Sequence, residues 1–374
     1  MLGWVVVNPA DALAQPTSTA GHASTAEASK KIAGNLMTEN ESTSDTAPES
    51  AWLLTPTFSV DPKLGTNGGA LVAYLPKLDP DSNQSMIAAA ATYSNTDSLV
   101  GAIFADLYWD SDKHKLTAGL IYGDIKNSYD DFLGTGVTAK TQDQLRAGAI
   151  RYRRRFGKDW YLGAQLIRSN YTIEPGMGMD DISEGIGLIG FDSTGIGALA
   201  EFDSRNDPRN PIQGTYFLAE NIAYREALGG EDSFDILGLD IRHYFTVGIR
   251  SSNSQAKTVI AVQWKNRWSI DAPLAGYSSI VLPGYTRGNY LNENMSHLMA
   301  DVRLPINKRW GFVAYGGVGC LFAESSQCGK EFYPAIGGGV SYLVKPEAGI
   351  VARLEVAKGK DDNSAIYLRF GHPF

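Results

Sequence analysis

The 374-residue sequence has few of the features that mark several protein classes. Its two cysteines are too few for a disulfide scaffold, and they do not have the spacing of zinc ligands. No run of 18 apolar residues is present, which excludes a membrane span built from an α-helix. Lysine and arginine number 33 against 41 acidic residues and form no basic stripe, so we expect no nucleic-acid partner.

Recognisable catalytic motifs are also missing. The sequence has no Gly-x-Ser-x-Gly elbow, no His-Glu-x-x-His, no Gly-Lys-Ser/Thr phosphate loop and no Cys-x-x-Cys. Its five histidines stand singly, and its loop acids do not have the spacing of a calcium site. We therefore expect no enzyme activity, no catalytic residue, no cofactor and no bound metal.

The first 50 residues differ in composition from the remainder. Residues 1–14 combine a short apolar run with Ala12-Leu13-Ala14, which is typical of a signal-peptide remnant, although no positive charge precedes the run. Either the true start codon is a different one, or the pattern is accidental. Residues 15–50 are rich in Ser, Thr and Ala, which predicts a disordered tail, with a helix at 26–37 as the alternative.

From residue 51 onward, apolar residues recur at every second position in segments of about ten residues, separated by turn-forming residues. In one such segment Leu298 and Val302 lie on one parity, while Asp301 and Arg303 lie on the other. One face of each predicted strand is therefore apolar and the other charged. Soluble β-sandwiches and membrane β-barrels both alternate in this way.

Sixteen candidate strands can be counted, which is an even number. They lie near 52–60, 69–77, 85–95, 99–110, 114–124, 140–156, 159–170, 190–203, 214–226, 233–248, 257–268, 292–304, 310–321, 331–344, 348–357 and 364–374. The long connectors 125–139, 171–189 and 269–291 all follow odd strands. A membrane barrel sorts its loops in this way, whereas a sandwich has no reason to. We therefore predict an all-β fold, a 16-stranded antiparallel transmembrane β-barrel over 51–374.

Two features near the C-terminus support export to an outer membrane. Ile366, Leu368, Phe370 and Phe374 share one parity, which we expect to face outward, and outer-membrane assembly machinery reads a terminal aromatic residue of this kind. Cys320 and Cys328 flank the seventh predicted extracellular loop. In an exported protein we expect them to form a disulfide.

The connector after the eleventh strand reads Pro283-Gly284-Tyr285-Thr286-Arg287-Gly288-Asn289-Tyr290. It resembles the Arg-Gly motif in the sixth extracellular loop of the BamA/TamA family of outer-membrane assembly and translocation barrels, also called the bacterial surface antigen family. In that family the loop folds into the lumen, where acidic residues hold its Arg. The resemblance implies a lumen-docked Arg287, the alternative being a solvated loop cation. Candidate partners on the lumen-facing parity are Asp301, Glu355, Glu201, Asp203 and Asp240.

A second match lies between the eighth and ninth strands, and the resemblance as a whole covers about 200–374. The residues that resemble the family's turn there are Asp203, Arg205, Asp207, Pro208, Pro211 and Gly214. The thirteenth strand, which usually carries an acid before a Gly, departs from the pattern with Val313-Ala314-Tyr315-Gly316. The 50-residue tail also leaves no room for the family's polypeptide-transport-associated repeats. This implies a barrel that works alone or with periplasmic accessory proteins.

The resemblance implies a monomer in the outer-membrane lipid of a Gram-negative bacterium that assembles, inserts or translocates polypeptides or lipids. The family is thought to act through a weak seam between its first and last strands, whose edges can pair with a client strand. Pro56, Gly371 and Pro373 fit a poorly paired seam. Two other functions stay open: a passive diffusion pore with a loop constriction, and a soluble all-β binding module. The mixed charges of the lumen-facing parity indicate a hydrated interior and not a selectivity filter.

Overall fold

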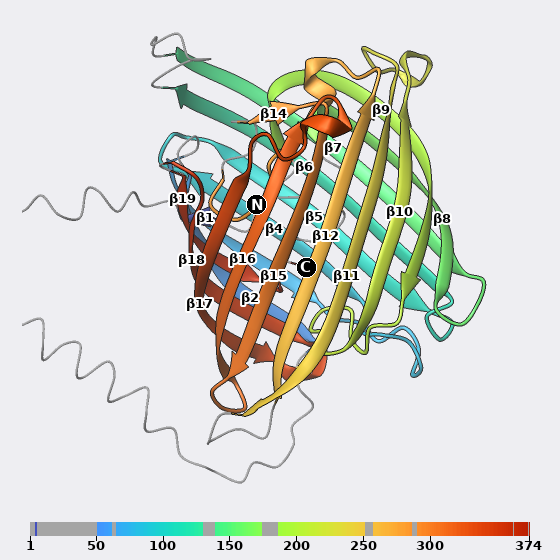
Figure 1. Ribbon diagram of the computed structural model, residues 1–374, viewed down its shortest axis with the longest axis vertical. Helices are drawn as coiled ribbons and strands as arrows, with labels where there is room; N and C mark the ends of the chain where they lie inside the picture. The colour runs from blue at the N-terminus through green and yellow to red at the C-terminus, as the bar shows by residue number, and fades with distance from the viewer. Residues whose placement is uncertain are drawn as a thin grey trace, which may run out of the picture. The chain divides into compact units, whose positions relative to one another are not determined.

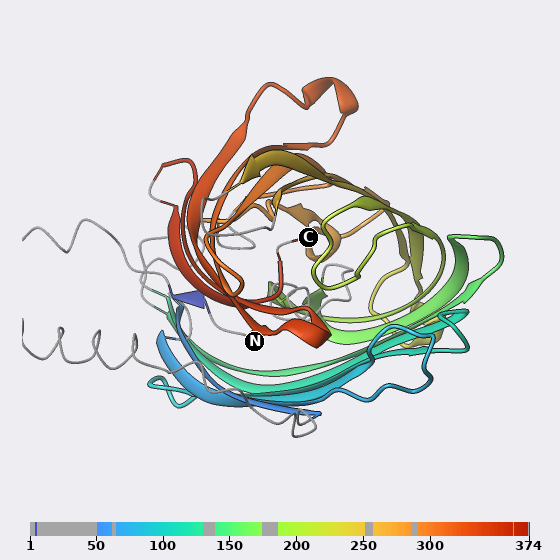
Figure 2. The same ribbon diagram turned by 90° about the horizontal axis from the view of Figure 1, so that it is seen from below.

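The computed structural model describes residues 4–5, 51–61, 65–129, 139–173, 186–250, 257–285, 290–361, 363–372 and 374. Within these ranges the chain is almost entirely β-strand, which confirms the predicted all-β class. Sixteen long strands, β2–β12 and β15–β19, form one antiparallel sheet in which strands adjacent in sequence are paired. The sheet curls into a barrel-like ring (Figure 1 and Figure 2).

The predicted strands are all present, with bounds that differ by a few residues from those expected. The long strands are β2 (Trp52–Asp61), β3 (Gly65–Tyr74), β4 (Met86–Ser94), β5 (Leu99–Trp109), β6 (His114–Tyr129), β7 (Ala139–Arg155), β8 (Trp160–Ile173), β9 (Ile186–Asp203), β10 (Gly214–Tyr224), β11 (Phe234–Arg250), β12 (Lys257–Ile270), β15 (Asn294–Pro305), β16 (Trp310–Phe322), β17 (Tyr333–Lys345), β18 (Ile350–Lys358) and β19 (Ser364–Phe370).

Short elements occur in the connectors and at the N-terminus. They are the two-residue strands β1 (Trp4–Val5), β13 (Ser278–Ser279) and β14 (Leu291–Asn292), and the 3-10 helices η3 (Glu226–Leu228), η4 (Leu274–Gly276), η5 (Ser325–Gln327) and η6 (Pro346–Ala348). Among the described residues, no helix has the length and apolar character that a membrane span requires.

Alternation along the strands places charged side chains inside the ring, together with apolar ones such as Ile236 and Met299, and exposes a second set of large apolar side chains on the outside. On β18, Arg353 and Glu355 are 0% and 1% exposed, whereas Leu354 and Val356 are 52% and 57% exposed. A soluble sandwich does the opposite, because it buries its apolar face between two sheets. The single sheet of successively paired strands, with ions buried inside it and large apolar side chains exposed outside, excludes two stacked sheets.

The connectors meet at two ends of the ring. The end formed by the connectors after β3, β5, β7, β9, β15 and β17 is called the turn end, and the other the loop end. At the turn end, backbone hydrogen bonds link successive connectors: Arg155 N donates to Lys113 O at 2.8 Å, and Asp203 N donates to Asp159 O at 2.9 Å. The long connector 271–293 lies at the loop end. It follows β12, the eleventh of the sixteen predicted strands, and the sequence predicts long connectors after odd-numbered strands of that count.

The sheet is not closed by its own first and last long strands. The boundary between β2 and β19 is called the seam from here on. Within the described ranges no residue of β2 is in register with a residue of β19. Strand β1 lies at the seam instead. Trp4 and Val5 pair antiparallel with Tyr367 and Ile366 of β19, and Val5 pairs parallel with Val60 of β2.

The last strand ends earlier than the sequence predicts. Strand β19 stops at Phe370 and not at residue 374, because Gly371 turns the chain with a φ of +114°, a conformation open to glycine without steric cost. The chain end then lies within the ring (Figure 2). Phe374 is 5% exposed, and its main-chain oxygen accepts a hydrogen bond from Arg303 Nη2 at 3.2 Å. The prediction that Phe374 faces outward is therefore wrong. Phe370, predicted to face outward as well, packs on the inward cluster that includes Leu71 and Met86.

Candidate functional site in the lumen

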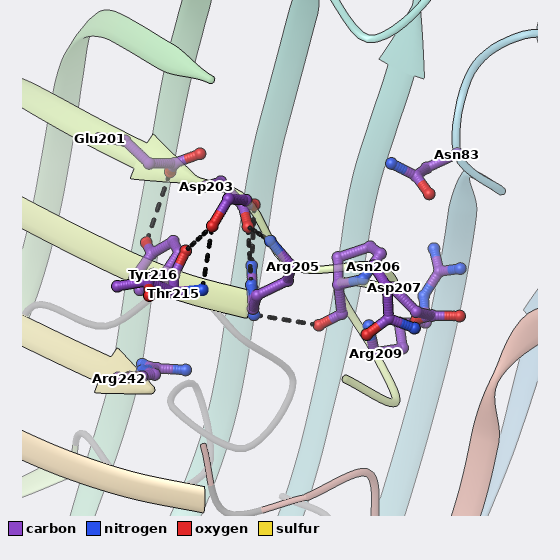
Figure 3. Close-up of polar contacts among 12 residues, drawn as sticks. Asn83, Glu201, Asp203, Arg205, Asn206, Asp207, Arg209, Thr215, Tyr216 and Arg242 are labelled. Carbon is purple, nitrogen blue, oxygen red and sulfur yellow. Dashed lines mark hydrogen bonds and ion pairs between the residues drawn. The ribbon is translucent and has the colours of Figure 1, made fainter. Parts of the chain in front are cut away.

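The inner wall from β6 to β10 carries a buried network centred on Glu201. Its carboxylate accepts hydrogen bonds from Lys115 Nζ at 2.9 Å and from Arg153 Nη1 at 2.7 Å. Lys115 Nζ also lies 3.0 Å from Asp203 Oδ2, and the Tyr216 hydroxyl donates to Glu201 at 3.4 Å (Figure 3). These side chains come from β6, β7, β9 and β10, so the network links strands that are not neighbours.

A second network lies on β15 and β18, closer to the seam. Asp301 accepts from Arg303 Nε at 2.7 Å and from Arg353 Nη2 at 2.8 Å. Arg353 also donates to Glu355 on its own strand. Asp301 and Arg353 are both completely buried, so each charge depends on the other for the stabilisation that water gives an exposed ion.

The β9–β10 connector brings the residues of the predicted turn motif together. Arg205 grips Asp203 with two parallel hydrogen bonds, of 2.8 Å from Nε and 3.0 Å from Nη2 (Figure 3). Arg205 Nη1 donates to Pro208 O at 3.2 Å, and the guanidinium lies 4.5 Å from the ring centroid of Tyr216. The bidentate contact fixes the orientation of Arg205 and holds the turn against the inner wall.

The remaining motif residues shape the same turn. Asp207 Oδ1 accepts the backbone N–H groups of the residues two and three positions later, at 2.7 and 2.9 Å, which is an Asx-turn arrangement. Pro211 O accepts from Arg303 Nη1 at 3.0 Å, which joins the turn to β15. Gly214 has a φ of +113°, and a Cβ there would lie 2.4 Å from Ser204 O, so this position requires glycine.

The residues after β19 return to the same place. His372 Nε2 lies 2.9 Å from Asn210 Oδ1, and His372 Nδ1 lies 2.9 Å from Arg353 Nη1. Burial and the positive charges of Arg303 and Arg353 lower the pKa of His372 well below its ordinary value, and the opposing effect of Asp301 is smaller. A neutral imidazole accepts at Nδ1 from Arg353 and donates at Nε2 to Asn210, which gives both ring nitrogens a partner.

At the loop end, the connector after β12 packs on the lumen face of β16. Ile280 and Leu282 are 1% and 2% exposed. An added Cβ at Gly317 would lie 3.1 Å from Leu282 Cδ2, so the glycines that replace the expected acid on β16 leave room for this connector. Gly284 has a φ of +96°, and a Cβ there would lie 2.9 Å from Gly359 N.

Two tyrosines of the loop motif attach this connector to strands near the seam. The Tyr285 hydroxyl donates to Pro334 O at 2.6 Å and accepts from Lys360 N at 2.8 Å. The Tyr290 hydroxyl accepts from Asn363 Nδ2 at 3.0 Å. The contacts reach β17 and the β18–β19 connector.

The docking of Arg287 stays a prediction, because residues 286–289, which include Gly288, lie outside the described residues. The five candidate acids all have basic neighbours: Glu201 and Asp203 bind Lys115, Asp240 binds Arg242, and Asp301 and Glu355 bind Arg353. An additional guanidinium would have to share one of these carboxylates. Pro373 also lies outside the described residues.

The cysteines are close enough to react, and Cys320 of β16 forms a disulfide with Cys328 just after η5. The bond ties the β16–β17 connector to the strand that precedes it. No group of three His, Cys, Asp or Glu side chains that could hold a metal ion occurs in the ranges that the structure describes.

A cavity of about 270 Å³ lies in the lumen, and the sequence reasoning did not predict it. Leu71, Met86 and Phe104 line one part of it, and Arg153, Arg209 and other charged residues line the rest. The sequence of β4 does indicate the apolar part of this cavity. Met86-Ile87-Ala88-Ala89-Ala90-Ala91 is apolar on both parities, so the inner face of this strand could not be charged.

No protein-family model and no curated protein sequence matches the chain. Among solved structures, it is similar to BamA from Haemophilus ducreyi lacking POTRA domains 1–3, with 12% identity, a TM-score of 0.50, and coverage of 87% of this chain and 70% of that one. It is also similar to CdiB from Acinetobacter baumannii, with 8% identity, a TM-score of 0.56, and coverage of 86% of this chain and 59% of that one. Identities this low establish the fold alone. The chain therefore has a β-barrel fold similar to that of BamA and CdiB.

Proposed function

We propose that the chain is an outer-membrane β-barrel of a Gram-negative bacterium that inserts or translocates polypeptide clients through its seam. The likeness to BamA and CdiB supports a barrel of this kind. The observation that carries the proposal is the absence, within the described ranges, of a register between β2 and β19. A strand edge without a full partner offers N–H and C=O groups to an incoming strand.

The strands that border the seam suit this role. Strand β19 has 7 residues and β18 has 9, compared with 18 in β9, so few ladder hydrogen bonds hold the last hairpin. Pro56 lies within β2 and cannot donate a backbone hydrogen bond.

The outer surface supports placement in a membrane. Exposed apolar side chains cover it, including Leu54, Leu120 and Ile336 at 73%, 64% and 68% exposed. Aromatic pairs stand at the turn end of the strands: Trp52 with Tyr74, Phe156 with Trp160, and Trp310 with Tyr342. Barrels in outer membranes carry an apolar band flanked by aromatic girdles of this type.

The filled lumen argues against a passive diffusion pore. The β9–β10 connector, the chain end at Phe374 and the connector with Ile280 and Leu282 all pack on the inner wall. We propose that the last of these connectors, together with a docked Arg287, holds the inner wall near the seam in place. The proposed action takes client polypeptides and lipid as partners, with the barrel working alone or with periplasmic accessory proteins, and it includes no catalytic step or cofactor.

A reversible lock across the seam tests the proposal. Leu53 of β2 and Phe370 of β19 pack on one hydrophobic cluster, so Leu53→Cys with Phe370→Cys can be joined by a cleavable bismaleimide linker. The measurement is the insertion of a urea-unfolded eight-stranded outer-membrane barrel into proteoliposomes, followed by heat-modifiable gel mobility. We expect the linked variant to insert no faster than protein-free liposomes, and cleavage of the linker to restore the rate.

The matched control links two strands that are already paired. Leu354→Cys with Leu368→Cys joins register partners on β18 and β19 and should leave insertion unchanged. Insertion that continues with the seam linked would refute the seam as the route. A large, steady single-channel conductance that neither linker alters would favour the diffusion pore instead.

A further inference from the structure

The lumen cavity has an apolar part that the proposed function does not use. Its lining includes Leu71, Met86 and Phe104 on β3–β5, which are at most 9% exposed, and Leu53 and Phe370 on the two strands that border the seam. Ordered water needs two to four polar partners, and an apolar surface does not supply them. This part of the cavity therefore favours a hydrocarbon group over water.

The other part of the lining carries an excess of positive charge. Seven Lys and Arg side chains line the cavity, against the acidic Asp106, Glu220 and Asp240. Four of the seven are bound in ion pairs with carboxylates. Lys265 faces Asp240 across the β11–β12 register, whereas no carboxylate of a described residue forms an ion pair with Arg209. The cavity is thus electrostatically suited to an anion.

Arg209 brings this charge to the edge of the apolar part. It extends from the β9–β10 connector (Figure 3). Its Nη2 donates to Gln84 O, two residues before Met86. Gln84 Nε2 in turn donates to Leu75 O, just after β3. Arg209 and Met86 both line the cavity, so a cationic group and an apolar surface adjoin within one site.

We propose that the cavity binds a single-chain amphiphile with an anionic head group, carboxylate or phosphate. The chain lies along Leu71, Met86 and Phe104, and the head group binds Arg209. A volume of about 270 Å³ is near the lower end of the range for small-molecule sites, roughly 300–1,000 Å³, so it suits one acyl chain and not two. The inference requires only the fold, and it stands whether or not the barrel handles polypeptides.

The test is equilibrium binding of radiolabelled palmitate to the full chain in phosphatidylcholine nanodiscs. We expect saturable binding of one molecule per chain. Arg209→Gln keeps a hydrogen-bond donor but loses the charge, and should weaken binding about tenfold. The control is Arg309→Gln, which alters an exposed arginine of the same end that also donates to backbone carbonyls, those of Leu343 and Val344. It should leave the affinity unchanged.

Further ligands and a second variant separate the contributions of chain and charge. Lysophosphatidylcholine has an acyl chain but no net charge, so it should bind more weakly and ignore Arg209→Gln. Lysophosphatidylglycerol, compared with palmitate, tells whether phosphate or carboxylate is preferred. Met86→Gln keeps the side-chain length but places an amide on the apolar part, and should weaken all three.

Heat-modifiable mobility confirms that each variant is folded before binding is measured. Three results would overturn the proposal: no saturable binding of palmitate or lysophosphatidylglycerol to the folded wild-type chain, displacement of both by inorganic phosphate alone, or equal losses in Arg209→Gln and Arg309→Gln.

Discussion

The inward side chains of β2–β5 and those of β6–β18 build the same inner wall with different chemistry. On β2–β5 they are mostly apolar or small, such as Leu71, Ala73 and Met86, and no described residue of these four strands takes part in an ion pair. On β6–β18 apolar inward residues such as Ile236 and Met299 are accompanied by many buried ions. Glu201 and Asp301 each bind two basic side chains there.

The two parts of the inner wall should differ in how strongly they resist separation of their strands. The pairs Lys115–Glu201 and Asp301–Arg353 join strands two or more positions apart in the ring, so separating those strands breaks several charge-assisted contacts together. The wall of β2–β5 has no such cross-links and borders a cavity. We infer that the part of the barrel beside β2 deforms first, which places the compliant wall where a client or a lipid chain would enter.

The largest expected effect comes from breaking the ionic wall. Asp301→Asn leaves Arg303 and Arg353 buried without their shared carboxylate, and losing one partner of a buried ion pair costs about 3–5 kcal/mol. The midpoint of urea unfolding in lipid vesicles measures the loss, with heat-modifiable mobility as the readout of folding.

An exposed pair supplies the control for this substitution. Asp110 lies 3.0 Å from Lys113, and their side chains are 51% and 55% exposed. Asp110→Asn should cost less than about 0.5 kcal/mol, since water screens the pair. Asparagine also tolerates the positive φ of 56° at this position. Similar losses in the two variants would show that the buried network does not hold the wall.

A smaller loss is expected from the apolar wall. Leu71→Ala removes buried methyl groups beside an existing cavity and should cost about 2 kcal/mol, the lower end for such substitutions. Leu218→Ala truncates a leucine that lines the same cavity from β10, and should cost a similar amount. Planar-bilayer recordings distinguish them: only Leu71→Ala, one strand from β2, should increase brief conductance openings. Equal recordings would contradict a compliant wall at the seam.

Most of the fold was predictable because alternation is a direct consequence of strand geometry. Parity therefore identified Asp301, Arg353 and Glu355 as inward residues. The ends of strands were harder. Strand β3 occupies 65–74 and not 69–77, since Pro76 cannot continue a ladder, and β19 ends at Phe370.

Within the site, contacts between residues close in sequence were easier to predict than contacts between distant ones. The turn motif was found through its resemblance to a family pattern, which is a local one: Asp203 and Arg205 are two residues apart, and they bind each other. Lys115 and Glu201 are 86 residues apart, and their pairing depends on the registers of all the strands between them, which one sequence does not reveal. The return of His372 into the lumen depends on a single glycine turn at Gly371, whose consequence could not be read from alternation.

The smallest expected effect tests the contact between the ionic wall and the chain end. The lowered pKa of His372 means that the folded chain keeps this imidazole neutral, while the unfolded chain protonates it below about pH 6.5. The unfolded state then binds more protons, so stability falls as the pH drops. From pH 7.5 to 5.5 the loss should be about 1 kcal/mol from this group. The unfolding midpoint at both pH values measures it. His372→Gln, which keeps a donor for Asn210 and an acceptor for Arg353, should remove that part of the pH dependence; an unchanged dependence would show that Asp301 and other acids account for it.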